Sequence, residues 1–352
     1  MKRQLESLCL VWLMTYVLLF AACSDEEEGP TTPTNGGSQP REWIVYADGS
    51  GVIKNIQAAV DTAASGDVII LENGTFNGDG NRDVEFAGKN LTVKSRSGDP
   101  DSCTIDCGGT PSEPHRAFYL RSNQNSSTVI EGLTITNGNH QPGGGIRLDG
   151  VSPVIRNCVF YQNTATDGGG VAIYSGSNPA ITDCVFRENT VVNSGGGSNL
   201  HTASATYTRC VFINNTAGSM GGGVRSTQSD FTLVECTFYG NEAPSGSGVD
   251  ARYSSNAILQ RCIASDGLQG SGIHCSSSTA TLTCCNLYNN AGGDWVGCVV
   301  NQAGVDGNMS ENPLFCDAGS GDLTLAANSP CLAAGPCARI GARDQGCPEI
   351  IR

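Results

Sequence analysis

Residues 158–163 read Cys-Val-Phe-Tyr-Gln-Asn, and the motif returns as Cys-Val-Phe-Arg-Glu-Asn at 184–189, Cys-Val-Phe-Ile-Asn-Asn at 210–215 and Cys-Thr-Phe-Tyr-Gly-Asn at 236–241. The cysteines of this hexapeptide lie 26 residues apart, and the same step reaches Cys262. Slightly shorter steps extend the register back to Leu133 and forward to Cys285. A constant period of this length indicates a repeat architecture, in which each repeat is one structural unit stacked on the next.

A second signature with the same period is a run of glycines. It appears as Gly-Gly-Gly at 143–145, 168–170, 195–197 and 221–223, and as Gly-Ser-Gly at 246–248 and 270–272. Alternating apolar and polar residues follow most of these runs, as in Ile146-Arg147-Leu148, and this alternation is typical of a β-strand. The glycines themselves predict chain corners that need a positive φ.

A repeat of about 25 residues with two or three short strands fits one coil of a parallel β-helix. No helical pattern of ten residues fits inside a repeat, and the Trp-Asp signature of WD40 propellers does not occur. Stacked coils lie about 4.8 Å apart, so equivalent side chains form columns. We therefore predict an all-β solenoid of about 9–11 coils over residues 43–315. Its Cys and Phe columns should point inward, and its Asn column should lie at a corner, where side-chain amides bond between coils.

The repeats resemble those of a known group of proteins. Phe-x-x-Asn tetrapeptides paired with Gly-Gly-apolar segments, over roughly residues 125–295, are similar to the repeats of the chlamydial polymorphic outer-membrane proteins. The resemblance implies a single-stranded, right-handed winding. It also implies an adhesin-like role at a cell surface.

The start of the predicted solenoid carries a second resemblance. Val45 to Gly51, Ile56 to Ala63 and Gly66 to Leu71 are similar to the opening of the pectin-methylesterase and pectate-lyase-like superfamily. The middle segment places Ile56, Ala59, Val60 and Ala63 on one side, which predicts a short amphipathic helix. We expect this helix to cap the N-terminal end of the solenoid.

The first residues resemble a bacterial lipoprotein signal. Lys2 and Arg3 precede a largely apolar stretch from Leu8 to Phe20, and small residues lead to Cys23. The resemblance implies a signal peptide over 1–22, lipidation of Cys23 and attachment to a membrane through that lipid. An acidic, flexible tether is predicted for 23–42. We expect an exported lipoprotein of the outer membrane or cell surface; an ordinary signal peptide is the alternative.

The charge excludes one class of partner. The chain of 352 residues has 34 acidic against 20 basic residues, a net charge of −14. Nucleic acid is not an expected partner, because its phosphates require clusters of Lys and Arg.

The cysteines allow two interpretations. The column from Cys158 to Cys285 is either a disulfide ladder or a stack of buried thiols, and parallel in-register neighbours favour the thiols. Cys275 is expected to pack in the interior as well. The last four cysteines, Cys316, Cys331, Cys337 and Cys347, lie in a region poor in apolar residues, so disulfides are expected within a C-terminal cap over 316–352. No metal site and no cofactor are expected.

One polar face emerges from the alternation. Residues four places after the first glycine of each run should face outward; they are Arg147, Ala172, Asn199, Arg225, Asp250 and His274. Residues six places after it should do the same; they are Asp149, Tyr174, His201, Thr227, Arg252 and Ser276. We expect glycan binding by Arg147, Tyr174, Asn199, His201, Arg225 and Arg252. Asp250, His274 and Arg252 are the candidates for catalysis.

Three functions remain open. The first is a non-catalytic surface lipoprotein that binds glycans or cell surfaces, since nucleophile elbows, P-loops and zinc motifs do not occur. The alternative is a lyase or hydrolase that acts on an acidic polysaccharide through the Arg/Asp/His face. The third is a structural spacer in a surface layer.

Overall fold

The computed structural model describes residues 39–350, and the described residues from Pro40 onward belong to one compact unit. The predicted signal peptide, the lipidation site at Cys23 and most of the predicted tether lie outside these residues.

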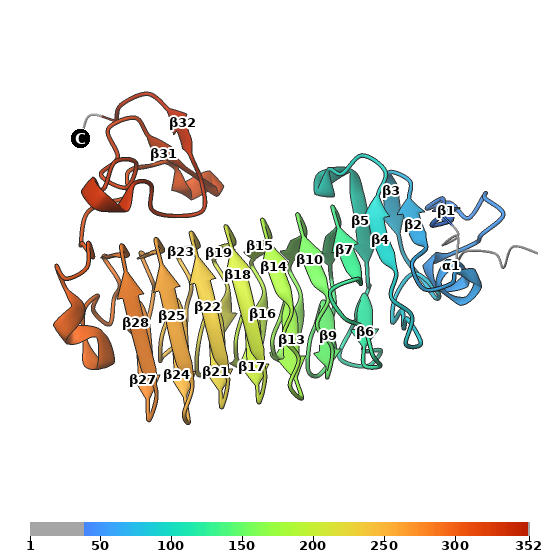
Figure 1. Ribbon diagram of the computed structural model, residues 1–352, viewed down its shortest axis with the longest axis horizontal. Coiled ribbons are helices and arrows are strands. Elements are labelled where there is room, and N and C mark those ends of the chain that lie inside the picture. Colours follow the sequence, from blue (N-terminus) through green and yellow to red (C-terminus); the bar gives the residue numbers. More distant parts are fainter. Residues whose placement is uncertain (1–38, 351–352) are drawn as a thin grey trace, which may run out of the picture. The chain divides into compact units, whose positions relative to one another are not determined.

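Three long parallel sheets build the solenoid (Figure 1). Sheet A holds ten strands: β1 (Glu42–Val45), β2 (Val68–Leu71), β4 (Thr92–Ser95), β7 (Val129–Glu131), β10 (Val154–Arg156), β14 (Ala180–Thr182), β18 (Ser204–Thr208), β22 (Asp230–Val234), β25 (Asn256–Gln260) and β28 (Thr279–Thr283). Sheet B holds nine: β3 (Gly74–Phe76), β5 (Cys103–Asp106), β8 (Thr134–Thr136), β11 (Val159–Tyr161), β15 (Val185–Arg187), β19 (Val211–Ile213), β23 (Thr237–Tyr239), β26 (Ile263–Ser265) and β29 (Asn286–Tyr288).

Sheet C forms the third wall and a short sheet lines one corner. Sheet C comprises β6 (Phe118–Leu120), β9 (Ile146–Asp149), β13 (Val171–Tyr174), β17 (Ser198–His201), β21 (Val224–Thr227), β24 (Val249–Arg252) and β27 (Ile273–Ser276). The corner strands are β12 (Thr164–Asp167), β16 (Thr190–Ser194) and β20 (Thr216–Ala217). From β4 to β27 the chain visits sheet A, then B, then C in each turn and pairs with the next turn in parallel register. The protein is therefore a parallel β-helix, and its ten strands in sheet A agree with the predicted 9–11 coils.

A short helix lies where the sequence predicts one. α1 (Ile56–Thr62) begins after Asn55, whose side chain accepts a hydrogen bond from the amide of Ala58. Its residues Ile56, Ala59 and Val60 are buried in the main core, and the helix contacts β1 and β2. Its role as a cap stays a prediction.

The interior contains the predicted phenylalanine column. Phe160, Phe186, Phe212 and Phe238 are buried and stack face to face, with ring centroids 4.6–4.8 Å apart. Each ring belongs to the centre of a three-residue strand of sheet B. In-register pairing therefore places one ring directly above the next.

The predicted asparagine column is also confirmed. The side-chain nitrogens of Asn163, Asn189 and Asn215 each donate to the side-chain oxygen one coil further on, at 2.9–3.0 Å, and the column ends at Asn241. Each side-chain oxygen also accepts a backbone amide of the previous coil, as Asn215 does from Asn189. The ladder thus satisfies corner backbone groups that no sheet covers.

The glycine runs are required for two different reasons. The first glycine has a positive φ, as at Gly168 with +66°. The third has no room for a side chain, because a Cβ on Gly170 would lie 2.7 Å from the ring of Phe186. The phenylalanine rings therefore occupy space that is free only because the neighbouring column consists of glycines.

The cysteine column consists of thiols, as expected. Cys158, Cys184, Cys210, Cys236, Cys262 and Cys285 are free and buried, and no disulfide joins Cys184 to Cys210. Their sulfurs donate to backbone carbonyls, as Cys210 does to Ile181 at 3.4 Å. Burial raises the pKa of Cys184 and Cys236 above the ordinary thiol value.

Cys275 packs against the core as predicted, but it is not a free thiol like those of the column. It forms a disulfide with Cys298 in the 3₁₀-helix η2 (Gly297–Gln302), which contacts β27 and β28. Cys275 does point toward the core, but it lies on the last strand of sheet C, where η2 brings a second sulfur within bonding distance. Cys298 lies outside the repeat, so the periodic pattern could not predict it as the partner of Cys275.

The C-terminal segment packs on the outer face of sheet B. Its small sheet contains β30 (Phe315–Asp317), β31 (Asp322–Ala326) and β32 (Gln345–Cys347), with 3₁₀-helices η3 (Ala318–Ser320) and η4 (Gly335–Cys337). Phe315, Leu323 and Ile340 form a second core with Val211 and Ile263 of sheet B. The outward residues of sheet B are therefore apolar where this segment covers them.

Disulfides hold this segment in place. Cys316–Cys347 is a bridge within the predicted region. Cys337 instead bonds to Cys284 in the solenoid, and Cys331 is a free, buried thiol. The expectation of pairing among the last four cysteines alone is therefore only half right, because the segment folds back against the solenoid.

We expect iodoacetamide at neutral pH to leave the nine buried thiols unmodified in the folded protein and to alkylate them after unfolding, as read by peptide mass mapping. Burial raises the pKa of Cys103 from 9.0 to about 12. Between these values the unfolded chain loses a proton that the folded chain keeps, so stability should fall as the pH rises above about 9. Rapid alkylation of Cys210 in the folded protein would contradict the buried column.

Within residues 39–350, no helix has both the length and the apolar character that crossing a membrane requires.

Candidate functional site

The predicted polar face is the outer surface of sheet C. The register pairs Arg147, Ala172, Asn199, Arg225, Asp250 and His274 in one column. It pairs Asp149, Tyr174, His201, Thr227, Arg252 and Ser276 in a second column. The structure therefore brings all twelve residues onto one sheet, in the predicted order.

Asp250 is the centre of the C-terminal part of this face. Its carboxylate is completely buried and accepts two hydrogen bonds from Arg252, from Nε at 2.7 Å and from Nη2 at 3.2 Å. Nδ1 of His274 lies 2.9 Å from Oδ2 of this carboxylate, the oxygen that also accepts from Nη2 of Arg252, in an orientation that forms no hydrogen bond. Asp250 thus holds a guanidinium and an imidazole side by side on two adjacent coils.

The middle of the face is a chain of polar contacts. Arg225 donates to the side-chain oxygen of Asn199 at 3.2 Å, and the Asn199 amide donates to the hydroxyl of Tyr174 at 3.2 Å. Burial lowers the pKa of Arg225 and raises the pKa of Tyr174. The ring of His201 lies 6.0 Å from that of Tyr174. The Arg225 guanidinium and the Tyr174 phenol are therefore partly removed from water, although both remain at the surface.

Arg147 occupies the N-terminal part of the face. Its guanidinium pairs with Asp149 at 2.8 Å and lies 5.5 Å from the centroid of the Tyr174 ring. Strand β6 adds one more coil here, with Tyr119 in register with Arg147. Sequence reasoning missed Tyr119, because no glycine run precedes it; the alternation Phe118-Tyr119-Leu120 was the available signal.

The face is less exposed than the sequence suggested. Ala172, Asn199, Thr227 and Asp250 are buried, although their side chains point outward. The reason is the glycine turn before each strand, which folds over the first column: a Cβ on Gly195 would lie 2.7 Å from the Cβ of Asn199. Asp250 therefore cannot itself exchange a proton with a substrate in this arrangement, and its role is to position Arg252 and His274.

Unpaired polar atoms gather on this face. Eight buried side-chain nitrogen or oxygen atoms have no hydrogen-bond partner between residues 39 and 350. Four of them belong to outward side chains of sheet C: Arg147 Nε, Arg225 Nε, Thr227 Oγ1 and His274 Nδ1. Half of the unpaired buried polar atoms among the described residues therefore belong to this one face.

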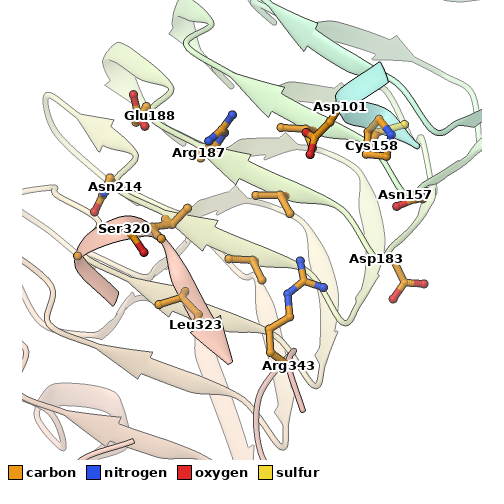
Figure 2. A pocket seen from close by; sticks show the side chains of 17 residues that line it. Asp101, Asn157, Cys158, Asp183, Arg187, Glu188, Asn214, Ser320, Leu323 and Arg343 are labelled. Atoms are coloured by element: carbon orange, nitrogen blue, oxygen red, sulfur yellow. The ribbon is translucent and has the colours of Figure 1, made fainter. Parts of the chain in front are cut away.

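A hollow lies on the outer face of sheet B (Figure 2). It has a volume of about 500 Å³ and a floor of Val159, Val185 and Val211 from sheet B. The 3₁₀-helix η1 (Pro100–Ser102) and the C-terminal segment, with Arg343, form its walls. Asp101, Asp183 and Glu188 line it together with Arg187 and Arg343, so its charges do not favour an anion. The outward valines at constant period were the sequence signal for it.

No group of three or more His, Cys, Asp or Glu side chains in the described part of the chain is arranged to hold a metal ion.

Comparison with protein families gives one match. The family model described as "Right handed beta helix region" matches residues 45–217 and 188–329. No curated protein matches the chain.

Solved structures share the fold at low sequence identity. Pectate lyase Pel9A is 13% identical, with a TM-score of 0.60, over 88% of this chain and 98% of that chain. A pectin methylesterase from Aspergillus niger is 14% identical, with a TM-score of 0.43, over 79% and 96% of the two chains. An alginate lyase from Paenibacillus sp. str. FPU-7 is 15% identical, with a TM-score of 0.37, over 88% and 99%. The first similarity shows a common fold, and the other two are too weak to support an argument.

Proposed function

Since the chain belongs to the right-handed β-helix family, we propose that it uses the outer face of sheet C to bind an acidic polysaccharide. The observation that carries this proposal is Arg225. Its guanidinium is half-buried, its only side-chain partner is the neutral Asn199, and its Nε has no partner among the described residues. A carboxylate or sulfate on a sugar would supply the missing negative partner.

The rest of the face suits a polymer of linked anionic sugars. Arg147, Arg225 and Arg252 are spread over five coils of a chain whose net charge is −14. With strands about 4.8 Å apart, Arg147 and Arg225 lie roughly 14 Å from each other along the solenoid. Tyr174 and His201 between them add planar groups against which sugar rings can pack. A neutral glycan would leave Arg225 without a counter-charge, whereas Arg147 and Arg252 already pair with Asp149 and Asp250.

Cleavage of the bound polymer is the second candidate function. Two observations favour it over a purely adhesive role: pectate lyase Pel9A has the same fold, and Asp250 holds Arg252 and His274 next to each other. In a β-elimination, a base removes the proton from the carbon beside the uronate carboxylate, a carbon–carbon double bond forms, and the glycosidic oxygen leaves and takes up a proton. Arg252 would bind the carboxylate and His274 would act as the base.

We also propose that the protein works outside the cytoplasm. Its three disulfides support this, because such bonds persist in oxidising compartments. Lipidation of Cys23 and attachment to the outer membrane or cell surface are part of the same proposal and rest on the sequence alone.

The test of binding is a calorimetric titration with polygalacturonate, alginate and neutral dextran. We expect the two acidic polymers to bind, dextran not to bind, and Arg225→Gln to weaken binding about 10- to 100-fold, since a hydrogen bond to a charged group contributes about 1.5–3 kcal/mol. Arg187→Gln is the matched control, because Arg187 is an exposed arginine on sheet B. Equal binding of dextran, or unchanged binding by Arg225→Gln, would contradict the proposal.

A further inference from the structure

Tyr119 on β6 is surrounded by three arginines at the N-terminal end of sheet C. The guanidinium carbons of Arg116, Arg121 and Arg147 lie 5.3, 5.0 and 5.1 Å from the centroid of its ring. We propose that this cluster, together with His140, is a binding site for one singly charged anionic group of a sugar, a carboxylate or a sulfate ester. The site does not depend on the proposed polymer binding, because it should also bind the small anion alone.

Arg116 is the reason for expecting an anion. It is 3% exposed, and it is the one Arg or Lys side chain buried within residues 39–350. Its guanidinium donates to the carbonyl of Pro142 at 2.8 Å and contacts Nδ1 of His140, and no carboxylate lies within ion-pair distance of it. Burial and the charge of Arg147 lower the pKa of Arg116 to about 10. A buried cation without a counter-charge costs free energy that a bound anion would offset.

The nearby carboxylates are already engaged elsewhere. Glu85 pairs with Arg121 at 2.8 Å, and Asp149 pairs with Arg147 at 2.8 Å. Asp83 lies 2.5 Å from Nδ1 of His115, and it reaches Arg116 only through the backbone amide. Arg116 is therefore the arginine of this cluster that has no carboxylate partner. One unpaired positive charge favours a ligand group with one negative charge.

His140 supplies a neutral donor to the same place. Burial and the charge of Arg116 lower the pKa of His140, so the ring is neutral at pH 7. Because a guanidinium only donates, Nδ1 of His140 must accept from Arg116, and its hydrogen then resides on Nε2. No described residue accepts from Nε2. The exposed guanidinium of Arg121 and the half-buried guanidinium of Arg147 lie against the same Tyr119 ring as Arg116 and supply further donors.

The test uses sodium methyl sulfate and sodium galacturonate, both singly charged anions, with sodium chloride at equal ionic strength as the reference. We expect saturable binding in calorimetry and a higher melting temperature for the wild-type protein. Arg116→Gln should weaken the binding at least about tenfold while leaving the melting temperature in chloride equal or higher, because it removes an uncompensated charge. A purely structural arginine would give the opposite result, a lower melting temperature in every salt.

Arg82→Gln is the matched control, since Arg82 also donates to a backbone carbonyl, that of Cys107, in a neighbouring coil. Added salts can also stabilise proteins in general, so equal responses of the wild type and Arg116→Gln would overturn the site. The stronger of the two anions identifies the ester or the uronate. If the small anions bind but polygalacturonate and alginate do not, the polymer proposal fails and this site stands. If the polymers bind and Arg116→Gln and Arg121→Gln have no effect on either ligand, only this site fails.

Discussion

Asn215→Ala is expected to lower the free energy of unfolding by about 4 kcal/mol. The side chain of Asn215 makes four buried hydrogen bonds: it donates to Phe186 O and Asn241 Oδ1, and it accepts from the amide and the side chain of Asn189. Alanine would leave these four groups unpaired in a dry interior, and each buried unpaired group costs about 1–3 kcal/mol before relaxation. Denaturant unfolding monitored by circular dichroism measures the change.

The control for this experiment is Asn178→Ala, because Asn178 is an asparagine at another corner whose side chain is exposed. We expect it to change stability by less than about 0.5 kcal/mol. Hydrogen exchange of the Asn189 amide should also accelerate in Asn215→Ala, because that amide loses its acceptor. A loss below about 1 kcal/mol would contradict this prediction; together with faster exchange of the amide, it would mean that water takes the place of the side chain at this corner.

Asp250→Ala is expected to destabilise the protein by about 2–3 kcal/mol and to abolish any cleavage of acidic polysaccharide. Breaking a fully buried ion pair typically costs about 3–5 kcal/mol. The loss is smaller here because Arg252 and His274 both reach solvent. Without Asp250, no described residue bridges these two side chains, although Ser245 still accepts a hydrogen bond from Arg252. The ultraviolet absorbance of unsaturated products from polygalacturonate and alginate measures the cleavage.

Asp149→Ala is the matched variant, since Asp149 pairs with Arg147 on the same face but remains partly exposed. Its stability should change by less than about 1 kcal/mol. His274→Ala should keep both the fold and polymer binding and lose cleavage, which separates chemistry from stability. Absence of unsaturated products from the wild-type protein would leave binding as the function of this face and reject the lyase hypothesis.

The columns could be predicted because they depend only on a constant period. Phe186, Asn189 and Cys184 recur at fixed spacing, and in-register parallel pairing converts that spacing into vertical stacks. The same reasoning placed Arg225 and Asp250 on one face. It could not show that the glycine turn lies over Asp250, because the path of a turn through space is not encoded in the period.

Contacts between segments without a common period could not be predicted either. Cys284 pairs with Cys337, and Cys275 with Cys298, because segments after the repeat fold back on the solenoid. Arg116 lies outside the glycine-led strands, and its burial against Pro142 and His140 depends on a turn of irregular length. Such partners follow from tertiary packing, which leaves no mark on local sequence.

The constant spacing of the coils also fixes the distances between equivalent residues along the solenoid. Each coil adds one residue to every column, so duplication of one 26-residue unit would move Arg225 one strand spacing, about 4.8 Å, farther from Arg147 without disturbing the stacks on either side. Gain or loss of whole coils can therefore tune the distance between charge-binding positions while the interior stays unchanged. A solenoid of this kind can adapt to polymers with different charge spacing by changing its length rather than its side chains.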